Sequence, residues 1–443
     1  MKGGSSRPAI RLSVAVSITC LLACRFAHGD DGTWIANPVN NDWNTPANWS
    51  SNTVPGPFDT ATFAVSNTTN ISIPVPNAGS ATLHNLGGTV SGATGGGVSF
   101  SFHTNAAEST ILNEGGQVSG AQGGSTIFQG NNPSAANATI IANGGAVSGA
   151  GGGLISFNDS SLAGNATLIA NGGVNGGVGG SIIFLRTTDG GTARVELFGN
   201  GNLDLGQHFS QPPMTFGSLE GDGVVFLSQR SLMIGGNGLS TIFSGVINGN
   251  GSLVKTGPGT LTLSGVNLYL DGTTVAEGVM RVSNTTGSAT GTGPVNVNAG
   301  TLGGSGIIAG AVTVGTGSGS GAFLTPGVGT NRQFTLTIQS ALTVNSDATY
   351  TYTFKGNRDR VRSDLVIAKW VTINDGTIVI SSSSQSRIRR GTVLNVISNT
   401  NAKPINGTFS NLPDGGIVNV NGTNLQASYG GGDGNDLILT VVP

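Results

Sequence analysis

The chain has 443 residues, of which 75 are glycine and 9% are charged, with a formal net charge of −2 at pH 7. Ordinary globular chains carry about 25% charged residues and about 7% glycine, so Ser, Thr and Asn must supply much of the polar surface. This charge balance excludes a strongly basic nucleic-acid-binding chain. The lack of a three-residue glycine period excludes collagen, and the regular spacing of Val, Ile, Leu and Phe excludes disorder.

Residues 1–29 have the pattern of a secretory leader. A basic start precedes an apolar run at 12–23, and a small-x-small cleavage site follows at 27–29. The apolar run is too short to span a bilayer, which takes about 20 residues. Cleavage before Asp30 would leave 15 of the 19 basic residues against 21 acidic ones, because the leader contains Lys2, Arg7, Arg11 and Arg25.

An alternative interpretation of this leader is a lipoprotein signal. Residues 21–24, Leu-Leu-Ala-Cys, resemble a bacterial lipobox, in which Cys24 would become the lipidated first residue. The other cysteine, Cys20, also lies in the leader. A chain cleaved before Asp30 would therefore carry no disulfide and would depend on its fold alone for stability.

Residues 30–95 form the predicted N-terminal cap. Three of the four tryptophans, Trp34, Trp43 and Trp49, lie close together in this segment. Such a cluster can be a sugar-binding platform or the closed end of a repeat core. We favour the cap, because the end of a repeat array exposes apolar surface and unpaired strand edges, and we keep the platform as the alternative.

Residues 96–240 are predicted to form a solenoid with repeats of about 28 residues. Segments 110–116, 139–145 and 167–173 share a Thr start and a Gly-Gly end, and a degenerate copy begins at Arg194, so the starts are almost evenly spaced. We expect the Gly-Gly corners to supply positive φ. Four phenylalanines recur in phase and are expected to stack inside the coil: Phe102, Phe128, Phe157 and Phe184.

Residues 241–330 contain the most regular pattern of the chain, at 249–282. Short alternating runs at 252–254, 260–264, 274–275 and 280–282 are separated by glycines. This pattern predicts strands and turns and leaves no room for a helix. Repeated units of this kind coil into a β-solenoid, in which each strand pairs with its counterpart one coil away.

This stretch resembles the autotransporter-associated β-strand repeat. The positions that carry the resemblance are Gly249, Gly251, Leu253, Lys255, Gly257, Gly259, Thr260, Leu261, Leu263, Gly265, Asn267, Tyr269, Gly272, Thr274, Val275, Gly278 and Val282. Met280 stands where leucine is usual, and Asp271 where a small residue is common. The resemblance implies a β-solenoid and a location outside the cytoplasm, and it names no activity.

Residues 331–443 form the predicted β-rich C-terminal region, with alternating runs at 335–338, 341–344 and 349–354. They resemble the region that follows these repeats in the family, so the resemblance covers 30–95 and 241–443. The family also carries a C-terminal β-barrel, whose strands are not found before Pro443. We therefore expect passenger material alone, and the sequence does not predict the route of export beyond the inner membrane.

Residues 431–439 match the calcium nonapeptide G-G-x-G-x-D-x-U-x once. Calcium takes six to eight oxygen ligands, which tandem copies supply together. The alternative that we favour is a tight turn, with residues 431–436 leading into the last strand.

Basic residues are concentrated between 355 and 390, where three aspartates oppose eight cations and the local net charge is +5. Such a patch can attract an acidic polysaccharide or a lipopolysaccharide phosphate, or it can be a solvated loop. The eight cations are Lys355, Arg358, Arg360, Arg362, Lys369, Arg387, Arg389 and Arg390.

No catalytic, cofactor or metal residue is assigned from the sequence. A glycosidase needs two carboxylates about 5–10 Å apart, and the close pairs do not recur on successive coils. These pairs are Glu220/Asp222, Glu108/Glu114, Asp359/Asp364 and Asp433/Asp436. We expect 218–223, which holds the first pair, to be a turn. The histidines outside the leader, His84, His103 and His208, lack metal-ligand spacing.

These observations predict an all-β fold, a right-handed and mostly parallel β-helix. At about 4.8 Å and about 25 residues per coil, it would be a rod on the order of 80 Å long. We expect a secreted or cell-surface stalk or adhesin-like protein without catalysis or a cofactor. The alternatives are a β-helical carbohydrate-active enzyme, a glycan-binding protein or a calcium-dependent module. Surface glycans or extracellular matrix are the expected partners, and nucleic acid is not.

Overall fold

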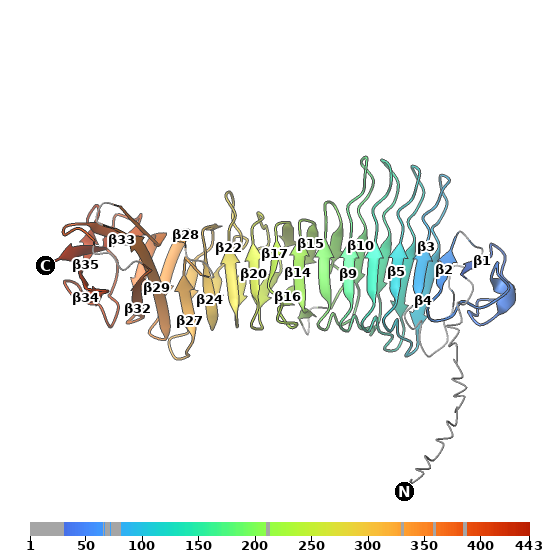
Figure 1. The fold of residues 1–443 in the computed structure, drawn as a ribbon, viewed down its shortest axis with the longest axis horizontal. Coiled ribbons are helices and arrows are strands. Elements are labelled where there is room, and N and C mark those ends of the chain that lie inside the picture. The colour runs from blue at the N-terminus through green and yellow to red at the C-terminus, as the bar shows by residue number, and fades with distance from the viewer. Residues whose placement is uncertain are drawn as a thin grey trace, which may run out of the picture.

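The computed structural model describes residues 31–64, 66, 71, 81–209, 213–328, 332–357, 360–383 and 388–443. The predicted leader at 1–29, with its alternative lipidation site Cys24, lies outside these residues, as do Arg358, Asp359 and Arg387. Within them the backbone forms an elongated coil of strands (Figure 1), with one 3-10 helix at Pro46–Asn48 and no α-helix.

Three sheets run along the coil. The first contains β1 (Gly32–Trp34), β2 (Thr60–Phe63), β3 (Thr82–Asn85), β5 (Thr110–Asn113), β7 (Thr139–Ala142), β9 (Thr167–Ala170), β11 (Arg194–Leu197), β14 (Ser218–Gly221), β17 (Thr241–Phe243), β20 (Thr260–Leu263), β22 (Val279–Val282), β24 (Gly300–Gly304), β27 (Ala322–Thr325), β29 (Ala348–Gly356), β30 (Val361–Ser363) and β32 (Thr377–Ser382).

The other two sheets divide the length of the coil between them. The second contains β4 (Gly97–Ser101), β6 (Ser125–Gln129), β8 (Leu154–Phe157), β10 (Ser181–Phe184), β12 (Asn202–Asp204), β15 (Val224–Ser228) and β18 (Val246–Gly249). The third contains β13 (Met214–Phe216), β16 (Ser231–Ile234), β19 (Ser252–Lys255), β21 (Thr273–Val275), β23 (Val295–Val297), β25 (Ile307–Ile308), β26 (Val312–Val314), β28 (Thr335–Val344), β31 (Leu365–Ile373), β33 (Val393–Asn399), β34 (Ile417–Val420), β35 (Thr423–Gly431) and β36 (Asp436–Val442).

Parallel pairing in register links successive coils. Thr110 of β5 lies opposite Thr139 of β7, which lies opposite Thr167 of β9, and Arg194 of β11 continues the series. The repeat found in the sequence is therefore confirmed as one coil per repeat. Farther along the coil is shorter, since Thr260 of β20 already lies opposite Val279 of β22.

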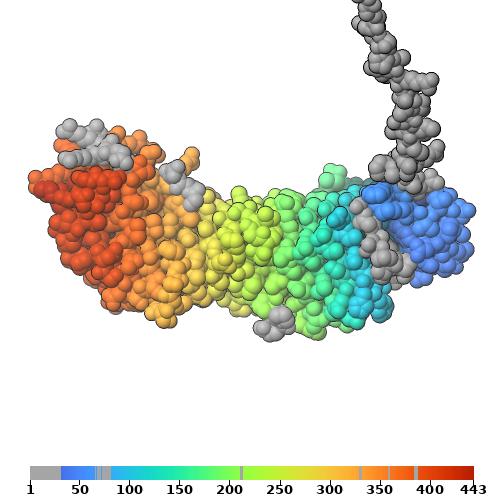
Figure 2. All heavy atoms as spheres, turned by 60° about the horizontal axis from the view of Figure 1, so that its bottom comes forward, coloured from blue at the N-terminus to red at the C-terminus, as the bar shows by residue number. Residues whose placement is uncertain are grey.

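The fold is thus a parallel β-helix, as predicted, and its handedness stays a prediction. Fourteen parallel pairings connect β1 to β32. At about 4.8 Å each they give a stack of roughly 67 Å, in agreement with the elongated outline in Figure 2. Antiparallel pairing enters at the C-terminal end, in β29–β30, β33–β36, β34–β35 and β35–β36. The predicted segment boundaries near 95, 240 and 330 stay predictions.

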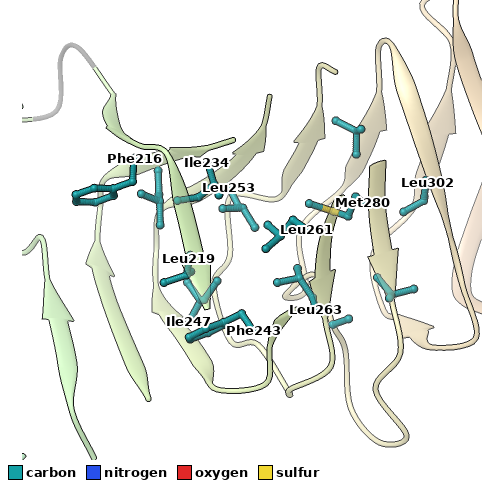
Figure 3. Close-up of a cluster of buried hydrophobic side chains, with 14 of the residues drawn as sticks. Phe216, Leu219, Ile234, Phe243, Ile247, Leu253, Leu261, Leu263, Met280 and Leu302 are labelled. Carbon is teal, nitrogen blue, oxygen red and sulfur yellow. The ribbon is translucent and has the colours of Figure 1, made fainter. Parts of the chain in front are cut away.

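The interior is filled by alternate residues of each strand, which point inward between the sheets (Figure 3). In β20 and β22 the pattern alternates half-buried and buried, so that Leu261, Leu263, Met280 and Val282 lie inside. Met280, which replaces the usual leucine, is fully buried. A flexible thioether fills the same space without a polar penalty.

A column of stacked phenyl rings fills the N-terminal half. Phe128 lies 4.8 Å from both Phe100 and Phe157, and Phe157 lies 4.5 Å from Phe184, with ring planes within 11° of parallel. The prediction of Phe102 as the first ring was wrong. Phe102 follows the end of β4, has a φ of +48° and is 72% exposed, whereas Phe100 pairs in register with Phe128.

The tryptophan cluster closes the N-terminal end of this core. Trp34 and Trp49 contact each other edge to face at 5.1 Å, Trp43 packs on Trp49 at 4.7 Å, and all three rings approach Phe63. Each tryptophan is at least nine-tenths buried. The rings are therefore packed as a cap requires and do not form an open platform for a sugar.

Four glycine-rich loops, here called the fins, protrude side by side from the same edge of the coil (Figure 1). They are residues 86–96, 114–124, 143–153 and 171–180, and their backbones hydrogen-bond from fin to fin. A Cβ on Gly116 would lie 2.4 Å from the Ala121 carbonyl oxygen in the opposite half of the same fin. The Gly-Gly corners are therefore required because the two halves of the fin approach each other too closely for a side chain. The expectation of positive φ at these corners was wrong. The glycines with positive φ lie at the tips of the fins, as Gly120 does with a φ of +79°.

Two polar residues of the 249–282 pattern, Lys255 and Asn267, also lie inside and support the backbone. Lys255 is 1% exposed, and its Nζ donates to the carbonyl oxygens of Thr256 at 2.6 Å, Gly257 at 2.7 Å and Glu277 at 3.2 Å. The Asn267 amide bridges two coils in the same way, through Ile247 N and Ala289 O. This part of the pattern satisfies buried backbone groups.

We predict that Phe128→Ala destabilises the N-terminal half of the coil. The substitution removes a ring that is stacked on both sides, and such core truncations cost about 3–5 kcal/mol. Phe102→Ala is the matched control, because the ring of Phe102 is exposed, and it should change stability by less than about 0.5 kcal/mol. Urea unfolding followed by circular dichroism measures both, and equal midpoints for the two variants would contradict the column.

We predict that Lys255→Met destabilises the chain, because leaving a buried acceptor without its donor costs about 1–3 kcal/mol. Burial lowers the pKa of Lys255 to about 8 from 10.5, against the opposing effect of Glu277. Between these values the unfolded chain holds more protons than the folded chain, so the free energy of unfolding rises with pH. This rise, about 3 kcal/mol at most, should disappear in Lys255→Met. Identical pH slopes in denaturant titrations of both proteins would refute the assignment.

Candidate functional site

The three described histidines lie apart and have different surroundings. The Nε2 atom of His84 contacts the Glu114 carboxylate at 3.1 Å, on a polar ladder that continues through Asn143. His103 is exposed, and His208 is buried with its Nε2 atom 3.0 Å from the Thr188 carbonyl oxygen. Among the described residues, no group of three or more His, Cys, Asp or Glu side chains could hold a metal ion.

The calcium-like segment is the turn of an antiparallel hairpin. Gly431 of β35 lies opposite Asp436 of β36, and the Gly434 N–H donates to the Gly431 carbonyl oxygen at 2.8 Å. The Asp436 carboxylate accepts the Asn399 N–H at 2.8 Å, and burial raises the pKa of Asp436 above its usual value. Parallel coils of nonapeptides, which would bring further oxygens to one ion, are not the arrangement at this hairpin.

Two glutamates and an arginine form an ionic cluster on the outer face of β11 and β14. Arg194 Nε contacts Glu196 at 3.1 Å and also contacts Glu220, and Glu196 and Glu220 are register partners. Burial raises the pKa of Glu196, with Glu220 adding to the rise and Arg194 opposing it. The coil thus brings together Glu196 and Glu220, a pair of carboxylates that is not among the close pairs in the sequence. Glu220 also lies in β14, where a turn was expected.

The described basic residues between 355 and 390 separate into two groups. Lys355, Arg360 and Arg362 line an open groove with a volume of about 880 Å³, together with Arg332 and Phe334. We call it the cationic groove. The others lie elsewhere: Lys369 stacks on Trp370 at 4.9 Å, and Arg390 faces the C-terminal residues 441–443. Arg332 reaches the groove from outside the 355–390 segment, so the clustering of charge in the sequence does not point to it.

A second groove of about 630 Å³ is lined by residues of all four fins and of the strands that follow three of them, so it crosses several coils. Its lining is uncharged and consists of backbone glycines with hydroxyl, amide and aliphatic side chains, among them Thr94, Gln122, Ser125, Leu154, Val178 and Ser181. We call it the fin groove. It offers hydrogen-bonding groups and small apolar surfaces, and its glycines expose backbone without side chains.

Comparison with known proteins matches the most regular part of the chain. Residues 253–282 match the family model of the passenger-associated-transport-repeat. A stretch of 78 residues is 46% identical to the adhesin BmaC autotransporter of Brucella suis biovar 1. That stretch is 18% of this chain and 2% of the relative, so the chain corresponds to a small part of the relative's length.

The match confirms the resemblance to autotransporter passengers over residues 253–282. These residues run from β19 to β22, where Lys255 and Asn267 support the backbone of the coil. Within the described residues, no helix has the length and apolar character needed to cross a membrane. The chain therefore carries a passenger-associated-transport-repeat within its β-helix, and it is similar to an autotransporter adhesin over a stretch of 78 residues.

Proposed function

We propose that this chain is a rod that is exported by a bacterium and presents its faces outside the cell, as an adhesin-like or structural protein without catalysis. The observation that carries the proposal is the passenger-associated-transport-repeat at 253–282, set within a continuous parallel β-helix. An adhesin with a similar stretch is consistent with this role.

The physical properties of the coil suit this work. Backbone hydrogen bonds link each coil to the next over the whole length of the first sheet, which makes the rod stiff. Most of the strands are paired on both sides, so few peptide bonds can adopt the extended, unpaired form that proteases cleave. The low charge of the chain, 9% of residues, leaves a surface of hydroxyl and amide groups. Surface glycans are therefore the partners that we propose, with the fin groove as the neutral contact.

We predict that the chain is accessible on intact producing cells or in their medium. Antibody labelling of intact cells and of their medium measures this, with a cytoplasmic protein as the control that the antibody does not reach. Mass spectrometry of the recovered chain should give a first residue of Asp30, or a lipidated Cys24 if the alternative leader is used. A chain that stays protected inside the cell with Met1 intact would contradict the proposed export.

A second candidate function is a β-helical carbohydrate-active enzyme, favoured by the cluster of Glu196 and Glu220. Glycosidase carboxylates lie about 5–10 Å apart, and two carboxylates that contact the same Nε atom are held no farther apart than about the lower limit of this range. A raised pKa in one member is what an acid needs. However, Arg194 contacts both carboxylates and holds them as an ion pair, which favours a structural role.

We predict that the purified protein does not cleave polysaccharides. Release of reducing ends or unsaturated products from polygalacturonate, alginate and xylan should not exceed that of the Glu196→Gln/Glu220→Gln variant. That variant should unfold at a lower temperature than the wild type, because it lacks the ion pair with Arg194. Polysaccharide cleavage by the wild type that disappears in the variant would replace the structural proposal with the enzymatic one.

A further inference from the structure

We propose that the cationic groove binds an anionic polysaccharide, through carboxylate or sulfate groups carried along the sugar chain. The groove lies where the β-helix changes from parallel coils to antiparallel hairpins, and it is lined by Arg332, Phe334, Lys355, Arg360 and Arg362. This inference deepens the proposed function by naming a ligand. It rests on that function only for the place of binding, which is outside the cell.

A like-charge pair on one hairpin points to an anionic ligand. Lys355 of β29 and Arg362 of β30 are direct register partners in an antiparallel pairing. Opposite partners project from the same face of a sheet, and like charges there destabilise the pairing. Both side chains are exposed. An anion bound between them would remove the repulsion, so the pair favours a ligand over a purely structural role.

The groove is built from segments that are fixed to each other. Asp364 is fully buried, and its carboxylate accepts the Phe334 N–H at 2.9 Å, the Thr353 N–H at 3.1 Å and the Thr353 hydroxyl at 2.7 Å. It thereby joins the segment that carries Arg332 to the hairpin that carries Lys355 and Arg362. Asp364 is a positioning residue, since its carboxylate is occupied by these donors. The groove is therefore preorganised, which reduces the entropy lost on binding.

The lining of the groove also indicates the kind of anion. Phe334 contributes a half-buried ring to the groove, and the guanidinium of Arg281 lies 5.6 Å from the centre of this ring. An aromatic ring packs against apolar C–H faces, which a sugar has and inorganic phosphate lacks. Among the described residues that line the groove, four are cations and none is a carboxylate. This combination suits a ligand that is both a sugar and an acid.

The chain offers a matched control for the test. The groove variant is Lys355→Gln/Arg360→Gln/Arg362→Gln, and the control variant is Lys369→Gln/Arg389→Gln/Arg390→Gln. Each removes one lysine and two arginines from exposed positions of the same basic segment, so the net charge of the two proteins is equal. Lys369, Arg389 and Arg390 do not line the groove. Circular dichroism and thermal melting check that both variants fold.

Binding of the purified wild type and both variants is measured by isothermal titration calorimetry at low ionic strength. The probes are polygalacturonate for carboxylate, heparin for sulfate and dextran as the neutral polymer. We expect at least one acidic glycan to bind and dextran not to bind. The groove variant should bind the acidic glycan at least tenfold more weakly, and the control variant should stay within twofold of the wild type. The stronger of the two acidic probes identifies the acid group.

Three results would overturn the proposal: no binding of either acidic glycan, equal losses in both variants, or tighter binding of single-stranded DNA or of phosphatidylglycerol vesicles. If the groove variant does not fold, Arg360→Gln and Arg389→Gln provide the same comparison at single exposed positions. Because the experiment uses purified protein, its failure leaves the export proposal standing. Retention of the chain inside the cell would likewise leave the binding result unchanged.

Discussion

Parallel backbone hydrogen bonding in register is the constraint on which the rest of this protein depends. It places each strand residue on its counterpart one coil away, so similar side chains stack wherever the repeat keeps the same residue type. The phenyl column from Phe100 to Phe184, the buried amide contact between Asn85 and Asn113 at 2.6 Å, and the glycines of the fins are three products of this geometry. A favourable contact between like side chains is repeated from coil to coil along the rod, and an unfavourable contact would be repeated in the same way.

The same constraint explains the low charge of the chain. A charged residue on a coil faces the corresponding residue of the next, and like charges at that distance destabilise the pairing. Only 9% of the residues are charged. In the cluster of Arg194, Glu196 and Glu220, the arginine contacts both glutamates and offsets their mutual repulsion. In the Lys355 and Arg362 pair, both partners are cations. This pair lies on a hairpin at the end of the regular coil, where stacking no longer dictates composition.

Local periodicity was sufficient to predict the coil, because the spacing of the repeats in the sequence is the register itself. It could not place Phe102, since residues 100 and 102 share the same parity and the strand ends between them. The stacking of Glu196 on Glu220 was missed because the coil that joins them is shorter than the preceding repeats. The fins and the cationic groove depend on contacts between different coils. Arg332 and Lys355, for example, come together only because consecutive strands lie on different faces of the coil.

The most direct test of this account measures the register itself. In a chain with Cys20 and Cys24 replaced by serine, spin labels on Thr139→Cys/Thr167→Cys would lie one coil apart, at about 4.8 Å between backbones. Labels on Thr110→Cys/Thr167→Cys would lie two coils apart, at about 10 Å. We predict strong dipolar broadening of the electron paramagnetic resonance spectrum for the first pair and weaker broadening for the second. Sharp spectra for the first pair, or equal spectra for both, would contradict the β-helix.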